Sequence, residues 1–233
     1  QHALGKNTTA SNNTAVGRKA LEENTTGTKN VAVGSLSLDA NTTASFNTGI
    51  GYASLSTNTT GTNNTAIGSN ALDVNTTGGQ NTAVGAFSLD ANTTANSNTG
   101  LGYQSLTANT TGTGNVAVGS NALRDSTTAD YNTAVGDQAL LLNSTGENNT
   151  AIGAFALDAN TTGSNNQAFG WGTLGGNTTG AQNTAVGLRA LRSNTTANNN
   201  VAVGYYALDA NTTGHSNTAV GHNALDANTT AAN

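Results

Sequence analysis

The stretch NTAVGRKALEENTTGTK, residues 13–29, is a seventeen-residue unit from which the whole chain is built. The next stretch, NVAVGSLSLDANTTASF at residues 30–46, follows the same pattern without a gap. Twelve leading residues, which form the tail of a unit, and thirteen full units account for all 233 residues. A fixed period of this kind is typical of repeat proteins, whose units pack on their neighbours rather than into one globular core. We therefore expect a single continuous array over residues 1–233, with a partial coil at 1–12 and thirteen full coils at 13–233.

The apolar positions of the unit favour strands over helices. With the unit numbered 1 to 17 from Asn13, position 4 is always bulky and apolar, and position 9 is always Leu. Two such residues per unit cannot make a helical stripe, and the abundant Asn, Thr and Gly are poor helix formers. Positions 2 to 4 alternate as a strand does, and we expect positions 2 and 4 to face inwards. A second short strand is expected near positions 8 to 14, with the Leu at position 9 inward. The predicted fold is an all-β parallel β-solenoid (β-roll) of about fourteen 17-residue coils.

Position 5 is glycine in every full unit. An invariant glycine predicts a positive φ or a close approach between backbones, so we interpret this column as a structural turn that ends the strand. Its members are Gly17, Gly34, Gly51, Gly68, Gly85, Gly102, Gly119, Gly136, Gly153, Gly170, Gly187, Gly204 and Gly221.

Stacked coils would place identical side chains in ladders. The Asn columns at positions 1 and 12 can then bond amide to amide. The core of such a coil is thin, which predicts that the chain associates with itself, most simply as a parallel trimer. The small residues at positions 3 and 8 are expected to let a neighbouring copy pack closely. Neither end carries an atypical capping unit, which favours end-to-end stacking into a filament as the alternative.

The composition excludes several classes of protein. Charged residues are 8% of the chain and the net charge is −5, without a basic stripe, so no nucleic-acid partner is expected. No apolar run is long enough to span a membrane. The absence of cysteine excludes disulfides and thiol chemistry. The strict phase of the apolar positions argues against disorder, although the chain is of low complexity.

No catalytic constellation interrupts the repeat, so we expect no enzyme, no metal and no cofactor. His2, His215 and His222 are scattered over variable positions. The position-10 aspartates could form a carboxylate row for Ca²⁺. Their column is interrupted by other residues and lacks the spacing of calcium-binding solenoids, so a metal site is not expected. These aspartates are Asp39, Asp73, Asp90, Asp158, Asp209 and Asp226.

Aromatic residues follow the turn glycine in several units. They should lie on one edge of the stack, where exposed rings can contact sugars or proteins. The alternative is that they pack across an interface between chains or over the turn. The candidate surface-binding aromatics are Tyr52, Phe87, Tyr103, Phe155, Trp171, Tyr205 and Tyr206.

The repeated NTT motif also matches the acceptor pattern for N-glycosylation. A glycan on every coil would need these asparagines to point outwards, whereas an internal Asn ladder would exclude it. The candidate positions are Asn24, Asn41, Asn58, Asn75, Asn92, Asn109, Asn143, Asn160, Asn177, Asn194, Asn211 and Asn228.

The motif NTAVG, in which Gly17 closes an alternating strand, resembles the head repeats of YadA-like trimeric autotransporter adhesins and related phage tail-fibre and surface-fibre repeats. The resemblance implies a left-handed, trimeric β-roll on the outside of a cell or virion. It also implies a non-enzymatic structural and adhesive role, with the chain itself, or a cell-surface glycan or protein, as partner. The second half of the unit, ALxxNTTG, has no close counterpart in those repeats. The alternatives are a self-assembling filament subunit and an ice-binding solenoid, which would need a flat face of outward Thr ranks.

Overall fold

The computed structural model describes residues 2–232 and comprises two compact units, Gln1–Gly114 and Asn115–Asn233. Each coil contributes one three-residue strand. The first unit contains β1 (Thr14–Val16), β2 (Val31–Val33), β3 (Thr48–Ile50), β4 (Thr65–Ile67), β5 (Thr82–Val84) and β6 (Thr99–Leu101). The second contains β7 (Val116–Val118), β8 (Thr133–Val135), β9 (Thr150–Ile152), β10 (Gln167–Phe169), β11 (Thr184–Val186), β12 (Val201–Val203) and β13 (Thr218–Val220).

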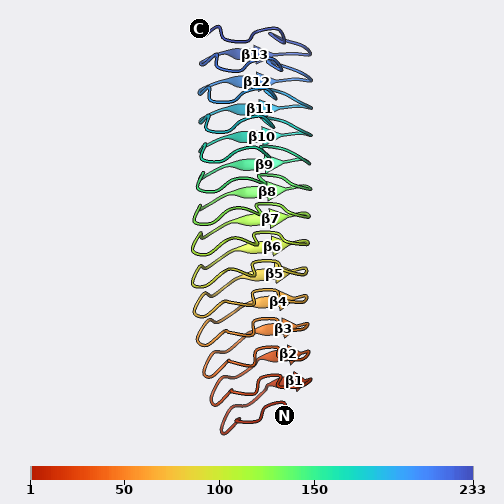
Figure 1. Cartoon of the computed structure of the whole chain (residues 1–233), viewed down its shortest axis with the longest axis vertical. Helices are drawn as coiled ribbons and strands as arrows, with labels where there is room; N and C mark the ends of the chain where they lie inside the picture. The colour runs from red at the N-terminus through yellow and green to blue at the C-terminus, as the bar shows by residue number, and fades with distance from the viewer. Residues whose placement is uncertain (1, 233) are drawn as a thin grey trace. The chain divides into compact units, whose positions relative to one another are not determined.

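Within each unit, every strand pairs in parallel with the strand of the next coil (Figure 1). The register places equivalent positions opposite one another, as in the pairs Thr65↔Thr82 and Ile67↔Val84. The described residues contain no helix, and therefore none that could cross a membrane. The predicted all-β parallel solenoid of 17-residue coils is thus confirmed.

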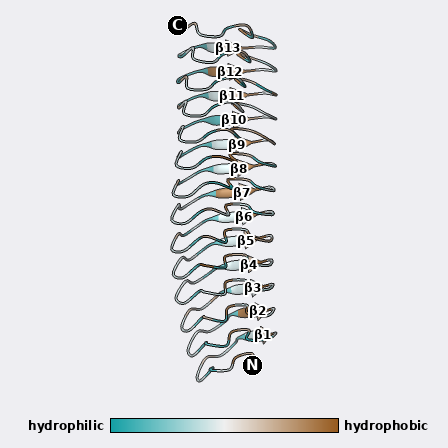
Figure 2. Ribbon diagram, in the orientation of Figure 1, coloured by the Kyte–Doolittle hydropathy of each residue, from teal (hydrophilic) through white to brown (hydrophobic). Residues whose placement is uncertain are grey.

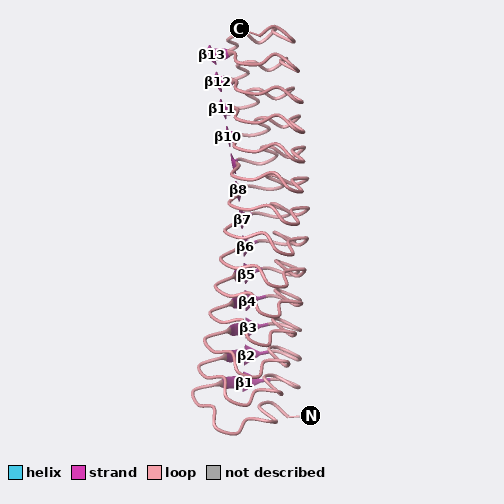
Figure 3. Cartoon of the chain, turned by 90° about the vertical axis from the view of Figure 1, so that its left-hand side faces the viewer, coloured by secondary structure: helices cyan, strands magenta, loops and turns pink. Residues whose placement is uncertain are grey.

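The prediction of a second strand near positions 8 to 14 is wrong. Figure 3 shows a single magenta strand in each coil and loop around the rest of it. The reason is a left-handed backbone at the buried leucine of position 9, with φ of 52° at Leu157 and 53° at Leu174. Position 7 is left-handed too, and a strand requires negative φ at each residue. The coils still bond to one another here, because Leu157 N donates to Thr173 O at 3.0 Å.

The side of the strand that faces the interior is the opposite of the one predicted. Position 3 points inwards, and Ala66 and Ala83 are fully buried, whereas Ile67 at position 4 is exposed. Leu72 and its equivalents at position 9 occupy the interior, as predicted. Inside the coil position 3 lies against the small residue at position 8, at distances that suit a methyl group or a glycine better than a larger side chain. Positions 3 and 8 therefore fill the core, and the expectation that they receive a neighbouring chain is wrong.

Two coils show how closely positions 3 and 8 meet. A Cβ added at Gly49 would lie 2.6 Å from Ser37 Oγ and 3.1 Å from Ser54 Oγ. These two hydroxyls instead lie 3.0 Å apart, and Ser37 Oγ donates to Gly49 O at 2.9 Å. Gly100 has the same relation to Ser88 and Ser105. Serine occupies position 8 nowhere else, so a glycine at position 3 accompanies a pair of serines at position 8.

The turn glycines bring successive coils into contact through their backbones. The φ of this column lies between 122° and 141°. A Cβ at Gly153 would lie 2.4 Å from Gly170 O, the carbonyl of the next glycine in the column. A side chain at position 5 is therefore excluded twice, by the backbone conformation and by the neighbouring coil.

The two Asn columns are fully buried through the interior of both units and differ in their bonding. At position 12 the amides bond to each other, as predicted, and Asn41 Nδ2 donates to Asn24 Oδ1 at 2.9 Å. At position 1 the side-chain oxygen mainly accepts from the backbone instead, as when Asn47 N donates to Asn30 Oδ1 at 2.9 Å. Asn30 Nδ2 and Asn41 Nδ2 both donate to Ala44 O, at 2.8 and 3.1 Å. Both columns thus satisfy buried polar groups along the stack.

Candidate binding surfaces

The outward side of the strands, which we call the strand face, carries the side chains of positions 2 and 4. Thr or Val occupies position 2 in all coils except one, which has Gln167. Position 4 is Val, Ile, Leu or Phe throughout, and Leu101 and Ile152 are among its exposed members. Because the strands pair in register, these side chains form two parallel ranks within each unit. In Figure 2 the browner strands are those with the sequence Val-Ala-Val, such as β2 and β7.

The strand face carries no charge. The chain has seven Lys and Arg residues and twelve Asp and Glu residues, and none of them falls at position 2 or 4. The face therefore combines hydroxyl and aliphatic groups on a surface that the backbone holds in a regular array. Exposed apolar patches of this kind on soluble proteins mark interaction sites.

The candidate aromatics lie in separate clusters rather than one continuous strip. Phe87 of one coil meets Tyr103 of the next, with ring centroids 6.3 Å apart and planes at 86°. Phe155 and Trp171 repeat this arrangement at 5.9 Å and 71°. In both pairs the ring at position 7 contacts the ring at position 6 of the following coil. Tyr103 and Trp171 are each about half exposed, so these pairs present aromatic surface to the solvent.

The third cluster is built around Tyr205 and Tyr206, whose centroids are 4.3 Å apart. The His222 ring stacks on Tyr205 at 5.2 Å with an interplanar angle of 3°. The Arg189 guanidinium lies over the Tyr206 ring, 4.8 Å from its centroid. The remaining candidate, Tyr52, is exposed.

Two exposed aromatics were missed by the sequence analysis. Phe46 and Tyr131 occupy position 17, just before the strand, and both are exposed. Lys29 Nζ lies 4.8 Å from the centroid of the Phe46 ring. Position 17 is otherwise polar or Gly, so an aromatic there stands out from its column and was the available signal.

Two of the position-10 aspartates, Asp73 and Asp90, accept hydrogen bonds from residues that interrupt their column. Ser56 Oγ donates to Asp73 Oδ1, and Thr107 Oγ1 donates to Asp90 Oδ1. Each of these hydroxyls comes from a coil adjacent to that of its aspartate. These two hydroxyl residues therefore act as hydrogen-bond donors to the carboxylates of adjacent coils.

Partial burial raises the pKa of three of these carboxyls, Asp39, Asp90 and Asp158, above the ordinary value. Hydrogen bonds from backbone N–H groups oppose this effect. Between residues 2 and 232, no group of three or more acidic, His or Cys side chains is arranged to hold a metal ion. The histidines, including His2 and His215, are exposed.

The asparagines of the NTT motif point into the coil. The candidates from Asn24 to Asn211 are fully buried, while Asn228 is partly buried. Asn58 Nδ2, for example, donates to Asn41 Oδ1 at 3.2 Å and to Gly61 O at 3.0 Å. A glycan on that nitrogen would displace both bonds and would need space that the folded coil does not have. Thr60, which completes this motif at position 14, is exposed instead.

No protein-family model matches this chain, and the searches of curated proteins and of solved structures also returned no match.

Proposed function

We propose that this chain is a non-enzymatic module of an extracellular fibre, with a structural role and a role in surface attachment. The observation that carries the proposal is the strand face, an uncharged surface whose aliphatic and hydroxyl ranks repeat in register from coil to coil. Behind this face, Asn side chains, Leu residues and turn glycines are all engaged in stacking one coil on the next. A chain organised in this way provides length and a repeated surface, which are the properties that a fibre requires.

The strand face also supports self-association. Its side chains stand on backbone that is bonded on both sides, so that packing another copy against it costs little conformational entropy. A second copy of the same chain offers a matching period of about 4.8 Å per coil. We propose a parallel trimer, as the YadA-like repeats suggest, with lateral contact through this face. The location outside a cell or virion rests on the same resemblance.

The attachment role is supported by the exposed aromatic clusters. Phe87 with Tyr103, and Phe155 with Trp171, offer rings to the solvent at the edge that follows the turn glycines. Aromatic rings with polar groups close by are common at protein and ligand interfaces.

Light scattering over a range of protein concentrations tests self-association. We expect a discrete species of three chains for the parent protein. In the double variant Ile50→Lys, Ile67→Lys, two exposed residues of the strand face become charged, and the species should shift to the monomer because ammonium groups resist desolvation.

The matched control is Thr60→Lys, Thr77→Lys, which adds the same charges to the same two coils at position 14, where both threonines are exposed. This control should keep the mass of the parent. A monomeric parent protein would refute self-association. Open-ended polymers that both double variants still form would instead support end-to-end filaments.

Ice binding is a second candidate, because the structure contains two outward Thr ranks. One is at position 2 of the strand face, represented by Thr65 and Thr82, and the other is at position 14. A flat, regularly spaced Thr array is the surface that this function needs. Thermal hysteresis of the purified protein tests it directly, and freezing without hysteresis excludes it.

A further inference from the structure

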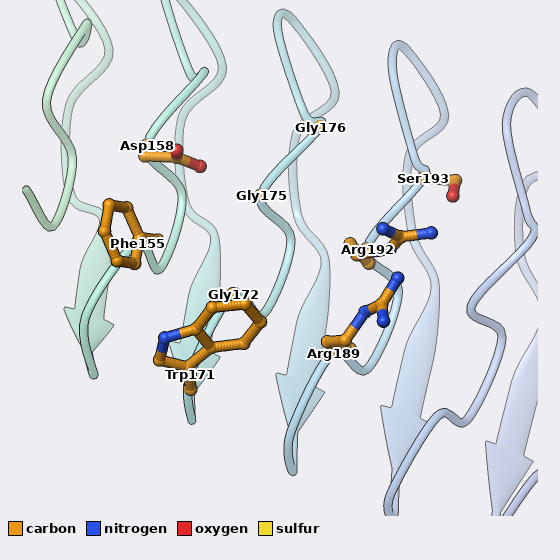
Figure 4. A pocket seen from close by; sticks show the side chains of 9 residues that line it. All are labelled: Phe155, Asp158, Trp171, Gly172, Gly175, Gly176, Arg189, Arg192 and Ser193. Carbon is orange, nitrogen blue, oxygen red and sulfur yellow. The ribbon is translucent and has the colours of Figure 1, made fainter.

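A pocket of about 650 Å³ opens on the second unit, beside the Phe155–Trp171 pair. Figure 4 shows that three successive coils line it. The first coil supplies Phe155 and Asp158, the second supplies Trp171 and three glycines, and the third supplies Arg189, Arg192 and Ser193. This volume lies in the range of small-molecule binding sites.

The middle coil of the pocket lacks three side chains. Gly172, Gly175 and Gly176 occupy positions 7, 10 and 11, and no other full unit has glycine in any of those columns. The backbone does not demand glycine at position 7. Gly172 has φ 58°, close to the 55° of Gln138 at the same position, and a Cβ there would meet nothing closer than Arg189 Cγ at 3.8 Å. The missing side chain at Gly172 therefore leaves open space in the pocket, next to Trp171 in the sequence, rather than relieving a clash.

The walls of the pocket differ in chemistry. On one side Asp158 offers carboxylate oxygens, and Phe155 and Trp171 offer apolar rings. On the other side Arg189 and Arg192 share a single carboxylate, that of Asp209, whose Oδ1 lies 3.1 Å from Arg192 Nε and 4.0 Å from Arg189 Nε. Because two guanidinium groups share one carboxylate, this side of the pocket keeps a net positive charge and N–H groups that can donate to a ligand.

The arginines are also held in place. Arg189 Nη1 donates to Tyr206 Oη at 2.7 Å, while its guanidinium lies over the Tyr206 ring. Arg189 Nε is buried and makes no hydrogen bond with any described residue. Because Arg189 and Arg192 are already held by these contacts, their side chains lose little conformational freedom when a ligand binds.

We propose that this pocket binds a pyranose saccharide, stacked on Trp171 with its hydroxyl groups between Asp158 and Arg192. A pyranose has a face of C–H groups and a rim of hydroxyls that both donate and accept. The pocket supplies the matching set, which comprises an aromatic ring, a carboxylate acceptor, guanidinium donors and the Ser193 hydroxyl. The inference rests on the attachment part of the proposed function and is independent of self-association.

A free amino acid is the competing small ligand, because its ammonium could pair with Asp158 and its carboxylate with Arg192. An amino acid without an aromatic side chain has no flat face to stack on Trp171. The aromatic wall of the pocket therefore favours the C–H face of a sugar ring.

Fluorescence of Trp171 tests the proposal, because it is the single tryptophan of the chain. The intact chain is titrated with the methyl glycosides of glucose, galactose, mannose, N-acetylglucosamine and glucuronic acid, and separately with free amino acids. We expect a saturable change in tryptophan emission with at least one glycoside. The variant Gly172→Gln introduces a side chain that Gln104 and Gln138 show to be compatible with this position. It should weaken the apparent affinity by about tenfold or more, because its side chain would occupy part of the pocket that the ligand needs.

The control Asn121→Gln places the same side chain at the same position of another coil of the second unit, outside the pocket, and should leave the titration unchanged. No emission change with any glycoside, an unchanged affinity in folded Gly172→Gln, or a response to amino acids alone would each overturn the proposal. The substitutions used in the light-scattering experiment do not change any residue of the pocket. A monomer that binds a saccharide would therefore refute self-association alone, and a trimer that binds none would refute the saccharide site alone.

Discussion

Asn160 donates its side-chain Nδ2 to the Oδ1 of Asn143 at 2.8 Å, and both side chains are fully buried. The same nitrogen donates to Gly163 O at 2.9 Å, which binds the loop of its own coil. One amide thus joins neighbouring coils and closes a turn. This double role explains why an otherwise polar motif, NTT, lies at the centre of a buried ladder.

The first prediction concerns this ladder. Asn160→Ala should lower the free energy of unfolding by about 2–4 kcal/mol. Asn143 Oδ1 loses its donor, at ~1–3 kcal/mol for an unpaired buried group, and Asn177 Nδ2 loses one of its two acceptors, at ~1 kcal/mol for a lost hydrogen bond. The midpoint of chemical denaturation, followed by circular dichroism, measures the effect. Thr162→Ala, an exposed change in the same motif, should stay within about 0.5 kcal/mol of the parent. Equal effects from the two substitutions would show that the ladder contributes no special stability.

The second prediction uses a natural break in the ladder. Ser126 replaces asparagine at position 12, and its buried Oγ has no hydrogen-bond partner among the described residues. Ser126→Asn should stabilise the protein by about 1–2 kcal/mol, since the new oxygen can accept from Asn143 Nδ2 and the new amide can donate to Ala129 O. A rise in the denaturation midpoint checks this. Ser126→Ala is the comparison, and if it stabilises as much as asparagine, the gain does not come from the restored ladder.

The third prediction separates two kinds of left-handed residue. Gly153→Ala should cost about 4 kcal/mol or more, because its Cβ would lie 2.4 Å from Gly170 O at a φ of 135°. Gly172→Ala should cost only about 1–2 kcal/mol, the ordinary penalty for a residue with a Cβ at a φ of 58°, because its Cβ would meet nothing closer than Arg189 Cγ at 3.8 Å. Thermal unfolding of the two variants and the parent, compared by their midpoint temperatures, measures the two losses. Similar losses would mean that the backbone angle, and not the contact between coils, restricts position 5.

The fourth prediction concerns pH. Burial raises the pKa of Asp39 and Asp90, so the folded chain holds these protons at a higher pH than the unfolded chain does. The stability that proton binding by these two carboxyls adds to the folded chain is therefore fully present below about pH 3.9, the ordinary pKa of aspartate. It is lost as the pH rises through the raised pKa of the folded state. Asp39→Asn with Asp90→Asn should make the protein more stable than the parent at neutral pH.

The same pair of substitutions should have little effect at about pH 3, where the parent carboxyls are protonated in both states. Denaturation midpoints at the two pH values give the comparison. A variant that is less stable than the parent at neutral pH would show that the ionised carboxylates stabilise the coil through their hydrogen bonds.

Much of the fold could be read from particular residues. The 17-residue spacing of Leu72 and Leu89 predicted both the length of the coil and a buried column, and the structure buries both side chains. The amide bond between Asn24 and Asn41 was also expected. These features are legible because a stacked repeat places each residue against its own equivalent, so the sequence of one unit describes its own environment.

The binding surfaces were harder to predict from the sequence. Trp171 was a candidate, yet Gly172, Gly175 and Arg192 passed unnoticed, because the pocket depends on side chains that are missing from one coil and present in its neighbours. Comparing each column for its exceptions would have found them. Their meaning becomes clear only when three coils are placed side by side.

The sequence by itself determined the period, the parallel register, the buried leucine and the turn glycine, because each of these follows from repetition and from backbone chemistry. Only the tertiary structure decided which side of the strand faces the core. Alternation in Thr65-Ala66-Ile67 defines two faces without saying which is inside. The interior next to position 8 decides it, because position 3 meets the position-8 side chains closely there, and the coil encloses the methyl group of Ala66 while Ile67 stays exposed. The larger residues are left on the outside, where they form the strand face.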